Sequence, residues 1–126
     1  MQTFKKEERL TTKKIIEELM RNGSSFSEYP FKVVYLKTKL NTTFPAQVVI
    51  SVPKKNFKKA VTRNKLKRRM REAYRRNKFL LYQALYECKE QRAIMLIYIA
   101  KAETEYKEIE SKISVALHRL VKLLKS

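Results

Sequence analysis

The sequence is poor in the residues that interrupt or cross-link a chain. It has one glycine, three prolines and one cysteine in 126 residues. So little glycine and proline excludes a long flexible linker and predicts that most of the chain is regular structure. The single cysteine, Cys88, cannot form an internal disulfide, and no neighbouring Cys or His completes a zinc site around it. We expect Cys88 to be an inert, partly buried thiol.

Long apolar runs are missing too. No stretch of about eighteen apolar residues could span a bilayer, and the opening residues MQTFKKEERL lack the apolar core of a secretory signal. We therefore expect a cytoplasmic protein without a membrane partner. The length, with 44% apolar residues, predicts one globular domain over residues 1–126.

Acidic residues are scarce, at 12 against 30 lysines and arginines, which gives a formal net charge of +18. Thirteen of the basic residues fall in residues 54–78, KKNFKKAVTRNKLKRRMREAYRRNK, where Glu72 is the only acid. Such density costs self-repulsion unless a polyanion supplies the counter-charge, so we expect a nucleic acid as partner. A membrane surface is disfavoured because this stretch has few large apolar residues to insert.

The sequence shows no constellation for catalysis by the protein itself. A nuclease acting through its own side chains needs a histidine pair, or clustered carboxylates that hold metal ions. His118 is the only histidine, and the acids are scattered along the chain. We therefore expect no catalytic residue and no metal ligand in this chain.

The hydrophobic pattern predicts an α+β fold, a small sheet with helices packed on it, in the order α-β-β-α-α-β-α. The expected helices cover residues 13–21, 60–76, 79–87 and 104–124, and the expected strands cover 31–36, 46–52 and 93–100. Residues 4–9 are expected to be extended. The second strand alternates between a buried and a half-open face, which is typical of an antiparallel pair, and the third is apolar on both faces, which predicts a covered central strand.

Two of the expected helices have distinct faces. In residues 60–76, Leu66, Met70 and Ala73 recur at helical spacing and should face the core. In residues 13–21, Ile15 and Leu19 are the better core candidates, while other apolar residues lie toward the flank and are free to line a groove.

The basic stretch and its flanking residues resemble a known family. Residues 60–73, AVTRNKLKRRMREA, are similar to the Arg-Asn-Arg helix of the bacterial ribonuclease P protein component, whose pattern is A-V-x-R-N-[RK]-hydrophobic-K-R-x-hydrophobic-R-E-hydrophobic. Lys54 and Lys55 match the family's Ser-Lys-Lys element after a strand. Its N-terminal F-…-R-L signature is matched by Phe4, Arg9 and Leu10.

Two departures from the family pattern stand out. Lys65 replaces a common arginine and so lacks its bidentate phosphate fork. Asn56, Phe57, Lys58 and Lys59 stand where the family often has a glycine, and this turn is one residue longer. The path of the turn is left open.

The resemblance implies a function. Members are small basic cofactors of a catalytic RNA that removes the 5′ leader from precursor tRNA. The RNA carries the active site and its Mg²⁺ ions, and we expect the protein to be monomeric within the complex. The family also has an unusual left-handed βαβ crossover.

The resemblance also implies two RNA-binding regions. The catalytic RNA should contact the basic helix through Arg63, Asn64, Lys65, Lys67, Arg68 and Arg71. Asn64 either contacts RNA or caps the helix. The single-stranded leader should lie in a cleft between the sheet and the first helix, lined by Ile16, Met20, Val34, Val49 and Ser51 with Lys54 and Lys55 at its rim.

Each apolar residue of the expected cleft fits ordinary core packing equally well. The first-helix positions, often aromatic in the family, are Ile16 and Met20 here, so apolar packing should replace base stacking.

Two other classes of function remain alternatives. Composition alone fits a non-catalytic structural RNA-binding protein, such as a ribosomal protein, equally well. A DNA-binding helix domain is disfavoured because the basic helix has no helix-turn-helix partner. The spacing of the basic motif favours the ribonuclease P protein.

Overall fold

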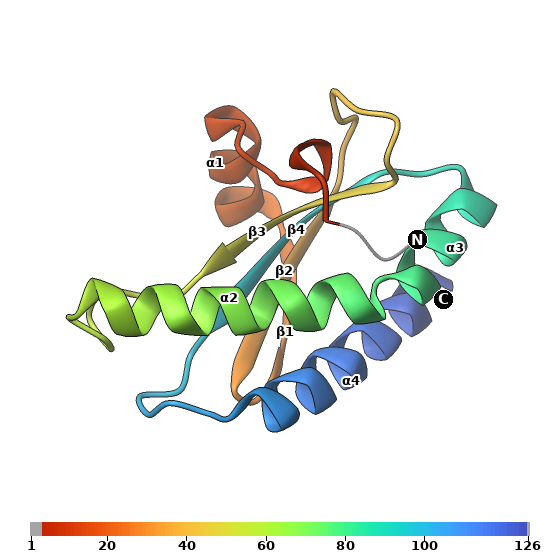
Figure 1. Ribbon diagram of the computed structural model, residues 1–126. Helices are drawn as coiled ribbons and strands as arrows, with labels where there is room; N and C mark the ends of the chain where they lie inside the picture. Colours follow the sequence, from red (N-terminus) through yellow and green to blue (C-terminus); the bar gives the residue numbers. More distant parts are fainter. Residues whose placement is uncertain (1–3, 126) are drawn as a thin grey trace.

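A four-stranded sheet organises the protein in a computed structural model that describes residues 4–125 (Figure 1). The strand order is β1-β2-β4-β3, where β1 is Ser24–Glu28, β2 is Phe31–Lys37, β3 is Ala46–Ser51 and β4 is Arg92–Tyr98. The pairs β1–β2 and β2–β4 are antiparallel, whereas β3 runs parallel to β4. The expected central strand is therefore confirmed.

Helices cover the two faces of the sheet unequally (Figure 1). A short 3₁₀ turn, η1 (Lys6–Glu8), precedes α1 (Lys13–Asn22), α2 (Ala60–Asn77), α3 (Phe79–Cys88) and α4 (Tyr106–Lys125). The long helices α2 and α4 lie side by side on one face, and α3 packs against α4. Helix α1 lies on the other face, mainly against β2 and β4.

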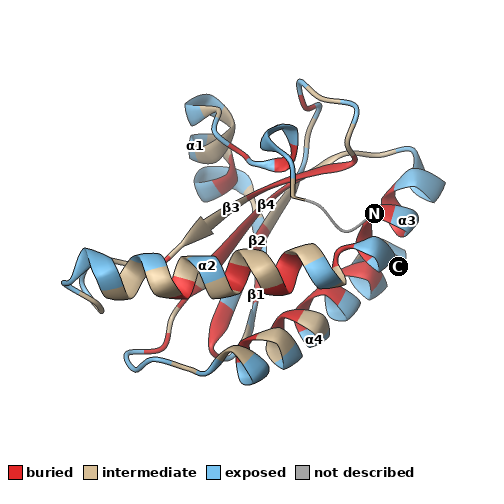
Figure 2. Ribbon diagram, in the orientation of Figure 1, coloured by how far each residue is buried: buried red, intermediate tan, exposed pale blue. Residues whose placement is uncertain are grey.

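The main core lies between the sheet and the α2–α4 pair. Leu66, Met70 and Ala73 are fully buried, as their spacing predicts, and so are Ile109 and Ile113 of α4. Figure 2 shows buried and exposed segments alternating along α2 and α4. Because these helices have apolar residues on one stripe only, their other sides stay in solvent.

A smaller cluster lies under α1. Leu19 is fully buried there against Val34 and Met95. Ile15 and Ile16, together with Val49 of β3, pack on its border and stay half-exposed. One short helix cannot cover a sheet of this width, so the face beside β3 remains half-open.

Three details of the expected fold are wrong. Strand β1 was not predicted, because SSFSE has a single large apolar residue, Phe26, to mark it. Strand β3 was expected in an antiparallel pair, but it pairs with β4, which lies between β3 and β2, and this pairing is parallel. Alternation along a strand does not reveal the direction of its partner. Lys6–Glu8 forms a helical turn where an extended segment was expected.

Two further points concern the connections and Cys88. The link from β3 through α2 and α3 to the parallel β4 is left-handed when traced in Figure 1, as the resemblance implies, against the usual right-handed preference. Cys88 is exposed rather than partly buried, because it ends α3 at the surface.

Candidate RNA-binding surfaces

Some cations of α2 are engaged within the protein. Lys65 pairs with Glu103 at 2.7 Å, and Arg69 donates a hydrogen bond to the backbone oxygen of Thr104 at 2.8 Å. Further along, Arg75 and Arg76 both bind Glu72. We call Lys65, Arg69, Arg75 and Arg76 the paired cations. The hydrogen bond from Lys65 lowers the pKa of Glu103, which therefore stays ionised beside α2.

Other cations of α2 have no such contact. Among the described residues, none forms a hydrogen bond or ion pair with Lys67, Arg68 or Arg71, which we call the free cations. Lys67 and Arg71 help to line a hollow of about 200 Å³ with Arg9, Thr11 and strand β3. Arg68 lies exposed in solvent. Like charges kept close without counter-ions favour the binding of an anion.

Arg63 and Asn64 begin the same motif but are placed differently. The Nη1 of Arg63 donates to the backbone oxygens of Phe57 at 2.7 Å and Lys58 at 2.9 Å, so this arginine holds the turn before α2. Asn64 is exposed, and the N-cap of α2 is Lys59. Asn64 therefore does not cap the helix, and its contact with RNA stays a prediction.

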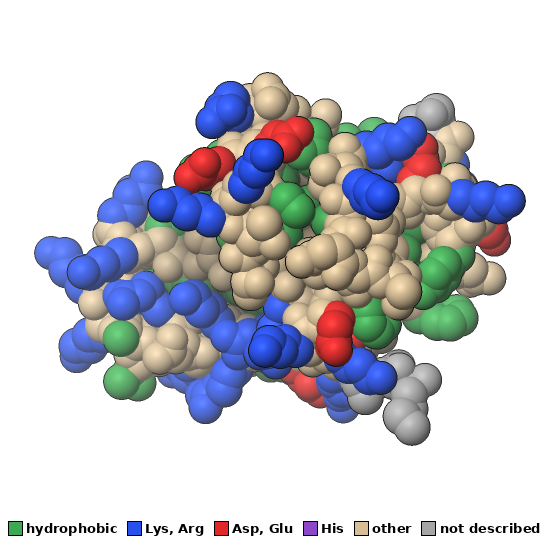
Figure 3. Space-filling model, turned by 90° about the horizontal axis from the view of Figure 1, so that it is seen from above, with side chains coloured by type: hydrophobic (Ala, Val, Ile, Leu, Met, Phe, Trp, Pro, Cys, Tyr) green, Lys and Arg blue, Asp and Glu red, His purple; other side chains and the backbone are tan. Residues whose placement is uncertain are grey.

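The basic residues form a continuous surface at one end of the molecule. In Figure 3, Lys and Arg side chains gather on the side that carries the start of α2 and the turn before it. Lys54 and Lys55 lie exposed in that turn. The positive charge thus adjoins the end of β3, where the half-open sheet face begins.

The residues expected to line a leader cleft lie on the α1 face of the sheet, with different exposure. Ile16, Val34 and Val49 belong to one apolar cluster, and Ser51 follows Val49 on the same face of β3. Val34 is only 8% exposed and is largely a core residue, whereas Met20 is 72% exposed on α1. Ile16, Val49 and Ser51 are half-exposed, so they offer the accessible part of this face.

A buried polar cluster holds the N-terminal segment in place. Glu8 is 1% exposed; it pairs with the ammonium of Lys78 and accepts hydrogen bonds from the Tyr82 hydroxyl at 2.6 Å and the Lys5 amide at 2.8 Å. Burial alone raises the pKa of Glu8, but the bonds from Lys78, Tyr82 and the Lys5 amide outweigh it and hold that pKa below its usual value. The cluster fixes Arg9 beside the free cations.

Sequence reasoning missed this cluster. Lys78 ends the basic stretch and was counted with the other cations, yet it lies buried against Glu8. Neither the segment KKEERL nor the end of the stretch carries a signal that distinguishes Glu8 from the exposed Glu7. The link joins residues seventy positions apart, so only the folded chain reveals it.

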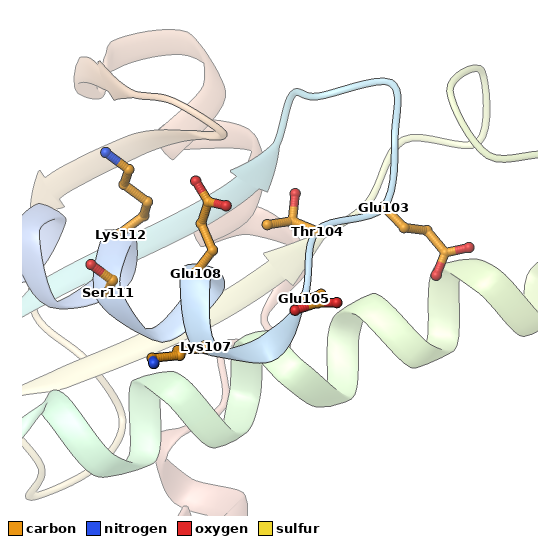
Figure 4. A pocket seen from close by; sticks show the side chains of 7 residues that line it. All are labelled: Glu103, Thr104, Glu105, Lys107, Glu108, Ser111 and Lys112. Atoms are coloured by element: carbon orange, nitrogen blue, oxygen red, sulfur yellow. The ribbon is translucent and has the colours of Figure 1, made fainter.

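An acidic hollow at the start of α4 offers no comparable site. Its carboxylates, from Glu103, Glu105 and Glu108, point in different directions in Figure 4. Within residues 4–125, no three His, Cys, Asp or Glu side chains gather in a way that could hold a metal ion.

His118 is exposed, and its Nδ1 lies 2.7 Å from the backbone oxygen of Ser114. In the part of the chain that the structure describes, no helix is long and apolar enough to cross a bilayer.

These features define a class. A compact α+β domain that carries cations without partners among the described residues on one helix, beside a half-open sheet face, has the surface expected of a nucleic-acid-binding domain.

Comparison with known proteins identifies the family. The profile of the Ribonuclease P family matches residues 4–121. The ribonuclease P protein component of Porphyromonas gingivalis is 33% identical over 115 residues, which cover 91% of this chain and 84% of that protein. The component from Chlorobium phaeobacteroides is 33% identical over 128 residues, covering 94% and 88%. The chain therefore belongs to the ribonuclease P protein family, as a component of this endoribonuclease.

Solved structures agree with the fold. The ribonuclease P protein from Thermotoga maritima superposes with a TM-score of 0.68 at 27% identity, covering 89% of this chain and 96% of that chain. The protein from Staphylococcus aureus, at 23% identity, shares the fold with a TM-score of 0.65 and covers 90% of this chain and 94% of its own. The resemblance noted in the sequence is confirmed, and the ribosomal-type alternative is set aside.

Proposed function

We propose that this chain binds the RNA subunit of ribonuclease P through the free cations of α2. The observation that carries the proposal is the pairing pattern of that helix: Lys67, Arg68 and Arg71 lack partners among the described residues, whereas acids and backbone oxygens engage Lys65, Arg69, Arg75 and Arg76. Arg63, Asn64 and Lys65 extend the contact at the start of the helix. Phosphates of a folded RNA supply the missing counter-charge by charge-assisted hydrogen bonds.

The 5′ leader of precursor tRNA binds on the half-open face beside β3. Ile16, Val49 and Ser51 form its accessible floor, Met20 adds an exposed apolar side chain from α1, and Val34 supports the floor from below. Lys54 and Lys55 stand at the rim. With aliphatic residues in place of aromatic ones, the grip on the leader bases comes from packing and from charge at the rim.

The chain takes part in tRNA 5′ maturation as a binding partner. The RNA subunit supplies the catalytic groups, and Mg²⁺ acts through that RNA. The protein is a monomer within the complex and works in the cytoplasm. Its membership in the family and its cationic surface support this role.

A reconstitution tests the proposal. Precursor tRNA with a 5′ leader is incubated at low Mg²⁺ with the ribonuclease P RNA of the same source, with this protein, and with both. We expect marked cleavage only when both components are present. Equal cleavage by RNA with and without the protein would contradict the cofactor role, and cleavage by protein alone would place the active site in this chain.

A further inference from the structure

A hollow of about 350 Å³, lined by Lys55, Asn56 and Lys101, lies where the chain leaves the two parallel strands. The turn with Lys55 and Asn56 follows β3, and Lys101 follows β4. Because β3 and β4 run parallel, their carboxyl ends meet at one edge of the sheet. Two segments far apart in the sequence thus form the walls of one hollow.

Tyr98, a fully buried side chain, connects both walls. On one side, the ring of Phe57 packs against the Tyr98 ring, with the two ring centroids 5.8 Å apart, and this contact holds the turn after β3. On the other side, the Tyr98 hydroxyl donates to the backbone oxygen of Ala102 at 2.7 Å, which anchors the loop after β4. The two walls are therefore held at a defined separation.

Helix α2 fastens the same two segments a second time. Arg63 donates to the backbone oxygens of Phe57 and Lys58, and Arg69 donates to that of Thr104. In the turn itself, the backbone N–H of Asn56 donates to the backbone oxygen of Pro53 at 3.2 Å. A site whose walls are fixed before the ligand arrives needs little ordering on binding.

The charge of the hollow fits an anion. No acidic residue lines it, and no described residue pairs with Lys55 or Lys101. The Asn56 side chain adds an uncharged amide donor. Two ammonium groups and an amide provide a compact set of donors for a phosphate, which lysine binds as a point charge.

We propose that Lys55, Asn56 and Lys101 form a binding site for one phosphodiester group of RNA. The site rests on the proposed function, which supplies RNA as the partner, and it adds Lys101, a residue outside the basic stretch 54–78. The phosphate belongs either to the ribonuclease P RNA or to precursor tRNA, and the test separates these sources.

The test compares wild-type protein with Lys55→Ala, Lys101→Ala and the double variant. Lys122→Ala, which removes one exposed lysine from α4, is the matched control. One arm measures the dissociation constant of the protein for ribonuclease P RNA. The other measures the dissociation constant of the assembled holoenzyme for precursor tRNA with its leader and for mature tRNA without it.

We expect each single variant to raise the dissociation constant in one of the two arms about three- to tenfold. Lys122→Ala should change neither dissociation constant by more than about twofold. Weaker binding of ribonuclease P RNA assigns the phosphate to that RNA. A loss with precursor but not mature tRNA assigns it to the leader, and an equal loss with both assigns it to the tRNA body.

Coupling between the lysines decides whether they share one ligand. Because both lysines contact the same phosphate, the dissociation constant of the double variant should rise by less than the product of the two single fold-changes. Losses that multiply without coupling, or unchanged affinities in both arms, would overturn the site. Failure of the wild-type protein to bind the RNA or to stimulate cleavage would instead contradict the proposed function, so the two failures are distinguishable.

Discussion

The free and the paired cations of α2 share one helix and one charge but differ in their surroundings. Lys65, Arg69, Arg75 and Arg76 have partners within the protein, whereas Lys67, Arg68 and Arg71 have none among the described residues. Charge density along the sequence cannot separate these two sets. The comparison teaches that one basic helix carries paired and free cations side by side, and that hydrogen bonds and ion pairs, unlike charge density, distinguish the two sets.

The largest expected effect concerns Glu8, whose buried contacts hold the N-terminal segment beside the free cations. Glu8→Gln removes the carboxylate that pairs with the buried ammonium of Lys78, which should lower the free energy of unfolding by about 3 kcal/mol. Urea denaturation measures the loss. Glu7→Gln, at an exposed neighbour, is the matched control and should change stability by less than about 0.5 kcal/mol.

The same variant has a defined pH dependence. The pKa of Glu8 is lower in the folded protein than its ordinary value of 4.5. Its contribution to stability is therefore fully present above that value and is lost as the pH falls through the lower folded pKa. The stability gap between wild type and Glu8→Gln should shrink in that acidic range. A gap that stays constant would contradict the ionised state of Glu8.

The next effect tests the free cations one at a time. Arg68→Glu replaces an unpaired, exposed cation with a repelling charge and should weaken binding of ribonuclease P RNA by about 100-fold or more, enough to abolish assembly at physiological salt. Arg76→Glu makes the same change at a paired cation and should cost less. Filter binding compares them, and equal losses would remove the distinction between the two sets.

A smaller effect separates holding a turn from holding a phosphate. Arg63→Lys keeps the charge but loses the planar fork that bonds the Phe57 and Lys58 oxygens. We expect faster amide hydrogen exchange in residues 54–59 and a stability loss of about 1 kcal/mol. Arg68→Lys should leave exchange in this turn unchanged. If the two variants behave alike, Arg63 does not hold the turn.

The smallest effect comes from a paired cation at the surface. Glu103→Gln releases Lys65, but both side chains are substantially exposed, at 39% and 41%. The free energy of unfolding should therefore change by less than about 0.5 kcal/mol, and RNA affinity at low salt should rise by no more than about twofold. Thermal melts and filter binding check both values. A tenfold gain would mean that this pair masks a main RNA contact.

Sequence patterns predicted the parts of the fold that have a strong period. The apolar spacing of Leu66, Met70 and Ala73 located α2 and its buried side, and the uniformly apolar run of β4 marked the central strand. Strand β1 escaped because its one large apolar residue gives no period. The parallel pairing of β3 depends on the crossover through α2 and α3, which alternation within a strand does not record.

The sequence predicts a basic candidate region but does not reveal which contacts each of its residues makes. The motif around Arg63 and Arg68 indicated an RNA-binding helix. Yet the bonds of Arg63 to two backbone oxygens and the burial of Lys78 against Glu8 depend on contacts that form only in the folded chain. Lys101 lies far from the basic stretch and joins it through the meeting of two strand ends.

The salt dependence of RNA binding tests the central claim most directly. Dissociation constants for ribonuclease P RNA are measured over a range of salt for wild type, for the triple alanine variant of Lys67, Arg68 and Arg71, and for that of Arg69, Arg75 and Arg76. Because each phosphate contact contributes about 0.7 to the log–log slope for a single strand and about 0.9 for a duplex, the first variant should reduce the slope for this folded RNA by about 2 to 3. The second should leave it nearly unchanged, and equal reductions in both would contradict the account.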